Sequence, residues 1–324
     1  MSDLAFIFPG QGAQFVGMGK ELADTFRSAK AVFEEVDAAL GQSLTSIMWE
    51  GPESDLTLTS NTQPALMAVS VASMRALDTE FGISVEQAKF VAGHSLGEYS
   101  ALCASGAMSL ADTAKLLRIR GNAMQAAVAP GIGAMAALLG ADPNQAQAAC
   151  EAGRAASSGI CEIANDNAPG QIVLSGSAEA IDAACAYARE NGVKKAVPLS
   201  VSAPFHCSLM LPAARKMHDA LQDTKIVAPK VSLMANVSAT PTSDPETIRR
   251  QLIEQVTARV RWRESVLAMH EAGVTKTAEA GAGKVLTVMN RRTVRELKGA
   301  TLGTPADLEA FAADLNGQRN QIDV

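Results

Sequence analysis

Short apolar runs alternate with helical spacings along this chain. Leu4 to Phe8 is wholly apolar and ends at Pro9-Gly10, which predicts a buried strand followed by a turn. From Leu22 to Leu40 the apolar residues recur at helical spacing and form one face. The polar segment Asn61 to Pro64 has proline just inside a helix start, and the long apolar stretch after it predicts a largely buried helix.

The pattern changes at Ala127 to Gly133, where a Pro-Gly pair and a further glycine indicate a hinge. The following residues predict the order β-α-β-β-α-β, as in the ferredoxin-like split βαβ arrangement. Turn-forming residues from Asn165 to Gly170 predict a loop between the two central strands. We interpret residues 129–198 as a small inserted subdomain. The expected ranges are strand 134–139, helix 143–154, strands 161–164 and 171–175, helix 178–190 and strand 195–201.

The remaining residues, 1–128 and 199–324, form the larger domain and again alternate strands with helices. This alternation is typical of a parallel sheet covered on both faces, so the predicted fold class is α/β. Residues 41–58 are irregular in pattern, and the last eight residues are expected to fray. The expected ranges are strand 90–92, helices 98–107, 110–125 and 209–221, strand 231–235, helices 245–258 and 262–272, strand 275–279, helix 283–297, strand 300–302 and helix 305–315.

Composition excludes several classes of protein. The 324 residues are 48% hydrophobic and carry a net charge of −6, so no global charge favours a nucleic-acid partner. The five cysteines are odd in number and lack C-x-x-C spacing, which argues against a disulfide framework or a zinc site. The start of the chain has no signal-peptide pattern, and no apolar run reaches the ~18 residues that span a bilayer. We expect a cytoplasmic protein with no membrane association.

Two glycine-rich segments lack what nucleotide binding requires. A dinucleotide fingerprint in the turn after Phe8 would need a third glycine where Phe15 stands. The segment Gly281 to Lys284 resembles a phosphate loop, but Val285 occupies the place of the Ser or Thr that holds a metal ion. We expect a loop of exposed N–H groups at the first segment and a helix start at the second.

The strongest chemical signal is the segment from Lys89 to Ala101, in which Gly93, Ser95 and Gly97 form a G-x-S-x-G pattern. An apolar run precedes it and helix-compatible residues follow, which is the strand-turn-helix context of a nucleophile elbow. The following helix would point its free N–H groups toward Ser95, where an oxyanion forms during acyl transfer.

A serine nucleophile needs a base, and the chain has four histidines. His218 and His270 lie in amphipathic helices, and His94 would point away from Ser95 on the turn. His206 lies in a non-helical segment from which it could reach the elbow, so we favour it as the base and expect activity to fall below a pH of about 6.5. Both a triad and a dyad oriented by a backbone carbonyl or an amide side chain remain open.

The motifs together resemble the malonyl-CoA:acyl carrier protein transacylases of fatty acid synthesis, and the likeness covers nearly the whole chain. The resemblance implies an α/β-hydrolase-like parallel-sheet domain with an inserted ferredoxin-like (βαββαβ) subdomain. It also implies transfer of malonyl from malonyl-CoA to the thiol of an acyl carrier protein, without a metal or redox cofactor. The motifs that carry it are FPGQGAQ, GHSLGEYSAL, RGNAMQ, NAPGQIVLSG, SAPFHC and GAGKVLT.

The resemblance assigns roles to individual residues. It makes Ser95 the nucleophile and His206 its base, with an oxyanion hole formed by the N–H groups of Gln11 and Leu96. It makes Arg120 the residue that binds the malonyl carboxylate. Two further substrate-binding residues follow from the motifs, Phe205, which would crowd out branched acyl groups, and Asn167.

Arg261 departs from the family pattern, because many relatives carry Gln there. It either takes the place of a polar neighbour of the histidine or faces solvent.

Two other functions remain open, a serine esterase or thioesterase on the same elbow and a non-catalytic scaffold that binds carrier protein. A carrier protein, being acidic, would dock on cations, although the same cations could form an ordinary solvated helix face. The densest cationic cluster consists of Lys284, Arg291, Arg292, Arg295 and Lys298, and a second consists of Arg189, Lys194 and Lys195.

Overall fold

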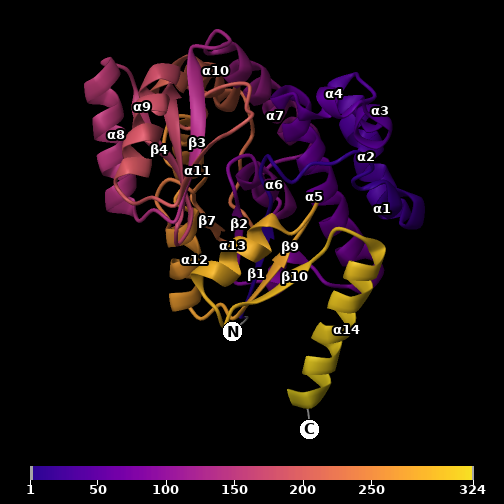
Figure 1. Ribbon diagram of the computed structural model, residues 1–324. Coiled ribbons are helices and arrows are strands. Elements are labelled where there is room, and N and C mark those ends of the chain that lie inside the picture. The colour runs from indigo at the N-terminus through magenta and orange to yellow at the C-terminus, as the bar shows by residue number, and fades with distance from the viewer. Residues whose placement is uncertain (1–2, 323–324) are drawn as a thin grey trace.

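A mostly parallel sheet forms the centre of the larger lobe in the computed structural model, which describes residues 3–322 (Figure 1). Strand β1 (Leu4–Phe8) pairs in parallel with β2 (Phe90–Gly93) on one side and with β9 (Lys276–Glu279) on the other. The strand order is β10-β9-β1-β2-β7-β8. Strands β7 (Leu233–Met234) and β10 (Lys298–Thr301) continue the parallel pairing. The predicted α/β class with a parallel sheet is confirmed.

Helices pack on both faces of this sheet. Leu4, Phe6 and Phe8 of β1 belong to a core shared with the N-terminal helices, whereas Ala5 and Ile7 belong to a core on the opposite face. Because side chains alternate across a strand, a wholly apolar strand is what two covered faces require. The helices of this lobe are α1 (Lys20–Thr25), α2 (Arg27–Leu40), α3 (Leu44–Glu50), α4 (Glu53–Thr57), α5 (Thr59–Phe81), α6 (Gly97–Ala104), α7 (Leu110–Ala126), α10 (Leu211–Gln222), α11 (Pro245–Gln255), α12 (Trp262–Glu271), α13 (Val285–Thr293) and α14 (Pro305–Ile322).

A second, antiparallel sheet forms the smaller lobe at the upper left of Figure 1, where helices α8 and α9 cover one face. Its strand order is β4-β5-β3-β6, and the chain passes through it in the predicted β-α-β-β-α-β order. This lobe has its own apolar core. Its elements are β3 (Gly133–Leu139), α8 (Pro143–Ser157), β4 (Cys161–Ala168), β5 (Gln171–Ser177), α9 (Ala178–Glu190) and β6 (Lys195–Pro198).

The prediction of a loop from Asn165 to Gly170 is wrong. Strand β4 continues to Ala168, and only Pro169-Gly170 forms the turn. The polar residues stay in the strand because β4 has register shifts there and because the N–H of Asp166 donates to the carbonyl of Val260 in the large lobe (3.0 Å). Pairing with a distant segment therefore overrode the local turn preference.

Other boundaries also differ. The irregular segment 41–58 contains α3 and α4, and β8 (Pro241–Thr242) is an added strand antiparallel to β7. Strand β6 ends at Pro198 instead of Val201. Helix α14 continues to Ile322, so the expected fraying is contradicted up to that residue, and residues 323–324 lie outside the described part of the chain. No helix within residues 3–322 is long and apolar enough to cross a membrane.

The two lobes are joined beside β4. The guanidinium of Arg263 on α12 donates to both carboxylate oxygens of the buried Asp166, with a shortest distance of 2.7 Å. A paired arginine fork fixes orientation as well as distance. This contact holds the end of β4 against the large lobe, next to the turn that carries Ser95.

Candidate active site

Ser95 lies in a tight turn between the end of β2 and the start of α6. Its φ is 53°, in the left-handed region that residues other than glycine rarely adopt. A Cβ on Gly93 would lie 1.9 Å from the carbonyl carbon of Gly97, and one on Gly97 would lie 2.2 Å from the carbonyl oxygen of Phe8. Backbone contact therefore requires both glycines, and the G-x-S-x-G pattern has the geometry of a nucleophile elbow.

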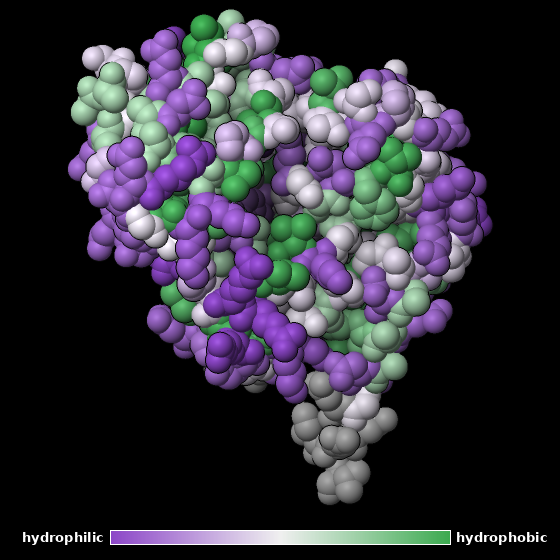
Figure 2. Space-filling view, in the orientation of Figure 1, coloured by the Kyte–Doolittle hydropathy of each residue, from purple (hydrophilic) through white to green (hydrophobic). Residues whose placement is uncertain are grey.

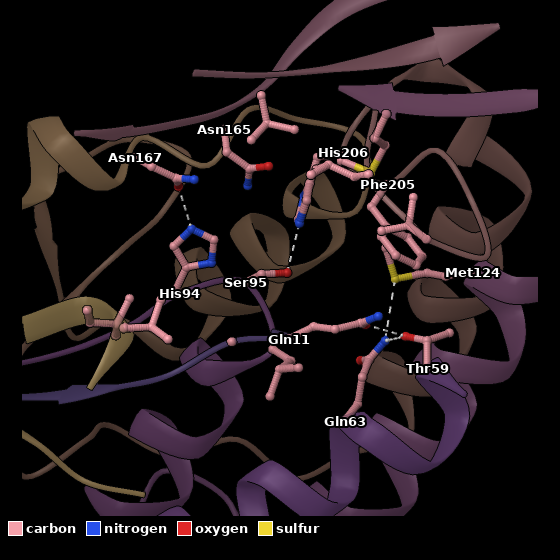
Figure 3. Close-up of a pocket in the computed structure, with 18 of the residues that line it drawn as sticks. Gln11, Thr59, Gln63, His94, Ser95, Met124, Asn165, Asn167, Phe205 and His206 are labelled. Atoms are coloured by element: carbon pink, nitrogen blue, oxygen red, sulfur yellow. Dashed lines mark hydrogen bonds between the residues drawn. The ribbon is translucent and has the colours of Figure 1, made fainter. Parts of the chain in front are cut away.

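His206 is brought to Ser95 from the segment between β6 and α10, and Figure 3 shows the two side chains pointing toward each other. Its Nε2 lies 2.7 Å from Ser95 Oγ, and its Nδ1 lies 2.8 Å from the backbone oxygen of Gln255. Because a carbonyl oxygen only accepts, Nδ1 carries the proton and Nε2 can accept the serine hydrogen. Of the arrangements left open by the sequence, the geometry is that of a dyad oriented by a backbone carbonyl.

The imidazole of His206 is 4% exposed. Burial, followed by the positive charge of Arg120, lowers the pKa of His206 to about 3. The expectation that activity would fall below a pH of about 6.5 assumed a solvated imidazole and is therefore revised. The neutral ring, the form that accepts a proton, persists far below neutral pH.

Arg120 reaches the same serine from α7 and is 1% exposed. Its Nη2 donates to Ser95 Oγ (3.1 Å) and to the side-chain oxygen of Gln255 (2.9 Å), and its Nη1 donates to the side-chain oxygen of Gln63 (2.8 Å). Its buried Nε has no hydrogen-bond partner within the described residues. These three acceptors are neutral, so none of them neutralises the guanidinium, which can therefore bind an incoming anion.

Gln255, at the end of α11, contacts every part of this arrangement. Its backbone oxygen orients His206, its Oε1 accepts from Arg120, and its Nε2 donates to the carbonyl oxygen of Ser95 (3.0 Å). The sequence interpretation missed this residue. A glutamine among polar residues near a helix end gives no local sign of such a role.

The other predicted site residues also lie around one cavity of about 180 Å³. Gln11, in the loop after β1, accepts from Thr59 through its side chain (2.9 Å), and Leu96 follows the serine at the start of α6. Phe205, next to His206, lines the cavity and is 9% exposed. Asn167 faces the cavity from β4.

His94 lines this cavity too, and its Nε2 lies 2.8 Å from the Oδ1 of Asn167 (Figure 3). Its ring is thus directed toward the small lobe and away from the serine hydroxyl, as expected. The contact ties the elbow to β4.

Arg261 does not line this cavity. Its Nε donates to Glu264 (2.9 Å), and its side chain is 34% exposed. Of the two alternatives for Arg261, the structure agrees with the partly exposed position. The polar neighbour of His206 is Gln255, six positions earlier in the chain.

Within residues 3–322, no group of three or more His, Cys, Asp and Glu side chains is arranged to hold a metal ion. The side chains around Ser95 instead combine a hydroxyl, a neutral imidazole and a buried cation. Chemically, this set can form a covalent acyl-serine and hold an acyl group that carries a negative charge.

Residues 5–324 match the acyl transferase domain family. The chain therefore belongs to this family of acyl transferases. A similar curated relative is the malonyl CoA-acyl carrier protein transacylase of Bacillus subtilis (strain 168), which is 44% identical over 310 residues, or 95% of this chain and 96% of the relative.

Solved structures agree with the family assignment. The acyl-carrier-protein-S-malonyltransferase of Bartonella henselae superposes with a TM-score of 0.94 at 54% identity, covering 98% of this chain and 100% of that one. A structure of a type II PKS acyl-carrier protein in complex with its malonyl-transacylase matches with a TM-score of 0.92 at 38% identity, covering 97% of this chain and 100% of that one.

Proposed function

We propose that this protein transfers a malonyl group from malonyl-CoA to the phosphopantetheine thiol of an acyl carrier protein, through a malonyl ester on Ser95. The observation that carries the proposal is the buried guanidinium of Arg120, which contacts Ser95 Oγ and has neutral hydrogen-bond acceptors. An acyl group esterified to Ser95 and ending in a carboxylate would place that carboxylate beside this cation.

In the first half-reaction, Ser95 Oγ attacks the thioester carbonyl while His206 Nε2 takes the serine proton. The N–H groups of Gln11 and Leu96 stabilise the oxyanion of the tetrahedral intermediate. The intermediate collapses as the carbon–sulfur bond breaks, and the coenzyme A thiolate leaves and takes the proton from His206. In the second half-reaction, the carrier thiol gives its proton to His206 and its sulfur attacks the ester carbonyl. The bond from the carbonyl carbon to Ser95 Oγ then breaks as Oγ takes the proton back from His206, which restores the serine and leaves malonyl on the carrier thiol.

The remaining cavity residues bind the acyl group. Arg120 binds the malonyl carboxylate, Phe205 limits the width of the cavity, and Asn167 borders the acyl chain from β4. The chemistry proposed here requires no metal or redox cofactor. The resemblance favours a role in fatty acid biosynthesis. Comparing the rates of malonyl transfer to a fatty-acid-type and to a polyketide-type carrier protein would test this role.

We also propose that the chain divides into a large domain, residues 1–128 and 199–324, of α/β-hydrolase-like type, and an inserted ferredoxin-like subdomain, residues 129–198. The order β4-β5-β3-β6 and the separate apolar core of the small lobe support this division. The site then lies where the two domains meet, with Ser95 on one and Asn167 on the other.

Intact-protein mass spectrometry after mixing with malonyl-CoA tests the function. We expect a malonyl adduct that disappears when carrier protein is added, and no adduct on Ser95→Ala, which lacks only the hydroxyl. An adduct of equal yield on Ser95→Ala would reject the nucleophile. Release of free malonate without transfer would indicate an esterase, and absence of any adduct on the parent protein would indicate a scaffold.

A further inference from the structure

A buried carboxyl group lies behind the elbow and has no part in the chemistry proposed above. Glu98, in the first turn of α6, is 1% exposed. Its Oε2 accepts from the backbone N–H of Asn236 (3.0 Å) and from the Nε2 of Gln255 (2.9 Å). Burying a carboxyl group costs free energy unless hydrogen bonds compensate for the lost water. The two groups that donate to Glu98 therefore indicate what this buried side chain does.

Each of these two partners contacts the site directly. The side-chain oxygen of Asn236 accepts from the backbone N–H of Ser95 (2.8 Å), and its amide nitrogen donates to the carbonyl of Gly93 (2.7 Å). Gln255 contacts Arg120 through Oε1 and His206 through its backbone oxygen. Glu98 is therefore one contact away from the nucleophile, the base and the guanidinium.

The orientation of the Gln255 amide matters because its two ends have the same shape and opposite hydrogen-bonding roles. A carboxylate only accepts, so Glu98 selects the amide nitrogen, and the amide oxygen then faces Arg120. With the amide reversed, its NH₂ would face the guanidinium, donor against donor. The other acceptors of this nitrogen are the carbonyl of Ser95 (3.0 Å) and the side-chain oxygen of Asn236 (3.3 Å), both at longer distances than Glu98.

We propose that Glu98 is a positioning residue that acts through Gln255 to hold Arg120 in the orientation that binds the acyl carboxylate. The inference rests on the proposed malonyl transfer. In this role the position of the Glu98 oxygen that accepts from Gln255 matters more than the charge of the carboxylate. Burial raises the pKa of Glu98 to about 7, in agreement with a site that tolerates the neutral form.

Two variants separate position from charge. Glu98→Gln keeps an oxygen at the same distance from the backbone and removes the charge, whereas Glu98→Asp keeps the charge and withdraws the oxygen by one methylene. The assay is kcat/KM for malonyl-CoA and for acetyl-CoA. For Glu98→Gln we expect both values within about threefold of the parent, and for Glu98→Asp a malonyl-to-acetyl ratio that falls by about tenfold, the scale of one charged hydrogen bond.

Glu279 supplies a matched control, because it is also a fully buried carboxylate that accepts from backbone N–H groups, those of Leu286 (3.0 Å) and Thr287 (2.7 Å). Glu279→Asp should lower Tm and change both substrates by the same factor. If Glu98→Asp behaves in this way too, or if Glu98→Gln loses as much as Glu98→Asp, the positioning role is wrong.

A variant at Gln255 tests the same link without altering Glu98. Gln255→Met removes the amide between Glu98 and Arg120 but keeps the backbone oxygen that orients His206, so the malonyl-to-acetyl ratio should again fall by about tenfold. An unchanged ratio would overturn the proposal. Failure of the parent protein to transfer malonyl would instead refute the proposed function, so the two failures are distinguishable.

Discussion

Replacing Arg120 with alanine should convert a malonyl-selective site into one that no longer favours malonyl over acetyl. In the parent protein the malonyl carboxylate would be buried next to a guanidinium that is 1% exposed. In Arg120→Ala the carboxylate would have no cation, and it would meet the side-chain oxygens of Gln63 and Gln255, which lose their donor. Substrate and protein would then both have unpaired polar groups.

Breaking a buried ion pair by removing one partner costs about 3 to 5 kcal/mol. Since ~1.4 kcal/mol corresponds to a tenfold change in rate, malonyl transfer should fall by about 10²-fold or more. An acetyl group has no carboxylate to desolvate, so its transfer should be unchanged or faster. The malonyl-to-acetyl ratio of kcat/KM should therefore shrink or invert.

Arg118 provides the control, because it lies on the same helix, is half-buried and donates to Asn61 (2.6 Å) and Gln42 (3.0 Å) away from the cavity. Arg118→Ala should leave the malonyl-to-acetyl ratio unchanged, and Tm measurements on both variants show how far folding is affected. Equal losses for malonyl-CoA and acetyl-CoA in Arg120→Ala would mean that Arg120 supports the fold or binds coenzyme A, and the carboxylate role would be refuted.

His206→Ala should slow acylation by about 10²-fold or more in single-turnover experiments, because the general base is lost; a loss of only a few-fold would place the base elsewhere. Because the pKa of His206 is lowered to about 3, its imidazole stays neutral as pH falls through 6.5, and kcat/KM should stay level from pH 8 to 5 wherever the protein stays folded. A decline centred near pH 6.5 would show that the ring is solvated. Charge reversal of the exposed Arg291 and Arg292 should raise KM for carrier protein and not for malonyl-CoA, whereas reversal of the exposed pair Arg215 and Lys216 on α10 should change neither. Equal effects of Arg291→Glu/Arg292→Glu on both substrates would reject docking there.

The predicted docking residues lie close to the cavity. Arg291 and Arg292 lie in the last turn of α13, a helix whose Val285 and Met289 line the cavity. Figure 2 shows hydrophilic residues gathered around this helix, beside the hollow between the two lobes. A carrier protein bound there would hold its thiol near the mouth of the cavity, so the cationic cluster is in a suitable place. The alternative of a solvated helix face predicts no change in KM.

Where contacts are local, the sequence was sufficient to predict them. The elbow could be predicted because its two glycines are required by contacts within one turn and with β1. The apolar run of β1 and the β-α-β-β-α-β order likewise depend on periodicity over a few residues. The structure contains each of these local features.

Features that depend on contacts between residues far apart in the sequence could not be predicted from the local pattern. Asn165 to Asn167 have turn-former composition but are held in β4 by Val260, almost a hundred positions away. Gln255 is joined to Ser95 and Arg120 only by the tertiary fold, so nothing in its neighbourhood indicates the site. The lowered pKa of His206 is a property of burial and of Arg120, which the sequence does not place together.

The neutral acceptors around Arg120 explain how a buried cation can stay ready for an anionic substrate. A carboxylate bonded directly to the guanidinium would satisfy its charge, and malonyl would have to displace that carboxylate or bring a second negative charge into the site. Gln63 and Gln255 satisfy N–H groups without neutralising the cation. The charge of Glu98 also acts on Arg120, but Glu98 reaches the guanidinium through Gln255, and burial raises the pKa of Glu98 to about 7, so Glu98 does not neutralise the cation as a directly bonded carboxylate would. Malonyl brings a negative charge to this guanidinium, whereas acetyl brings none, and selectivity follows from this difference.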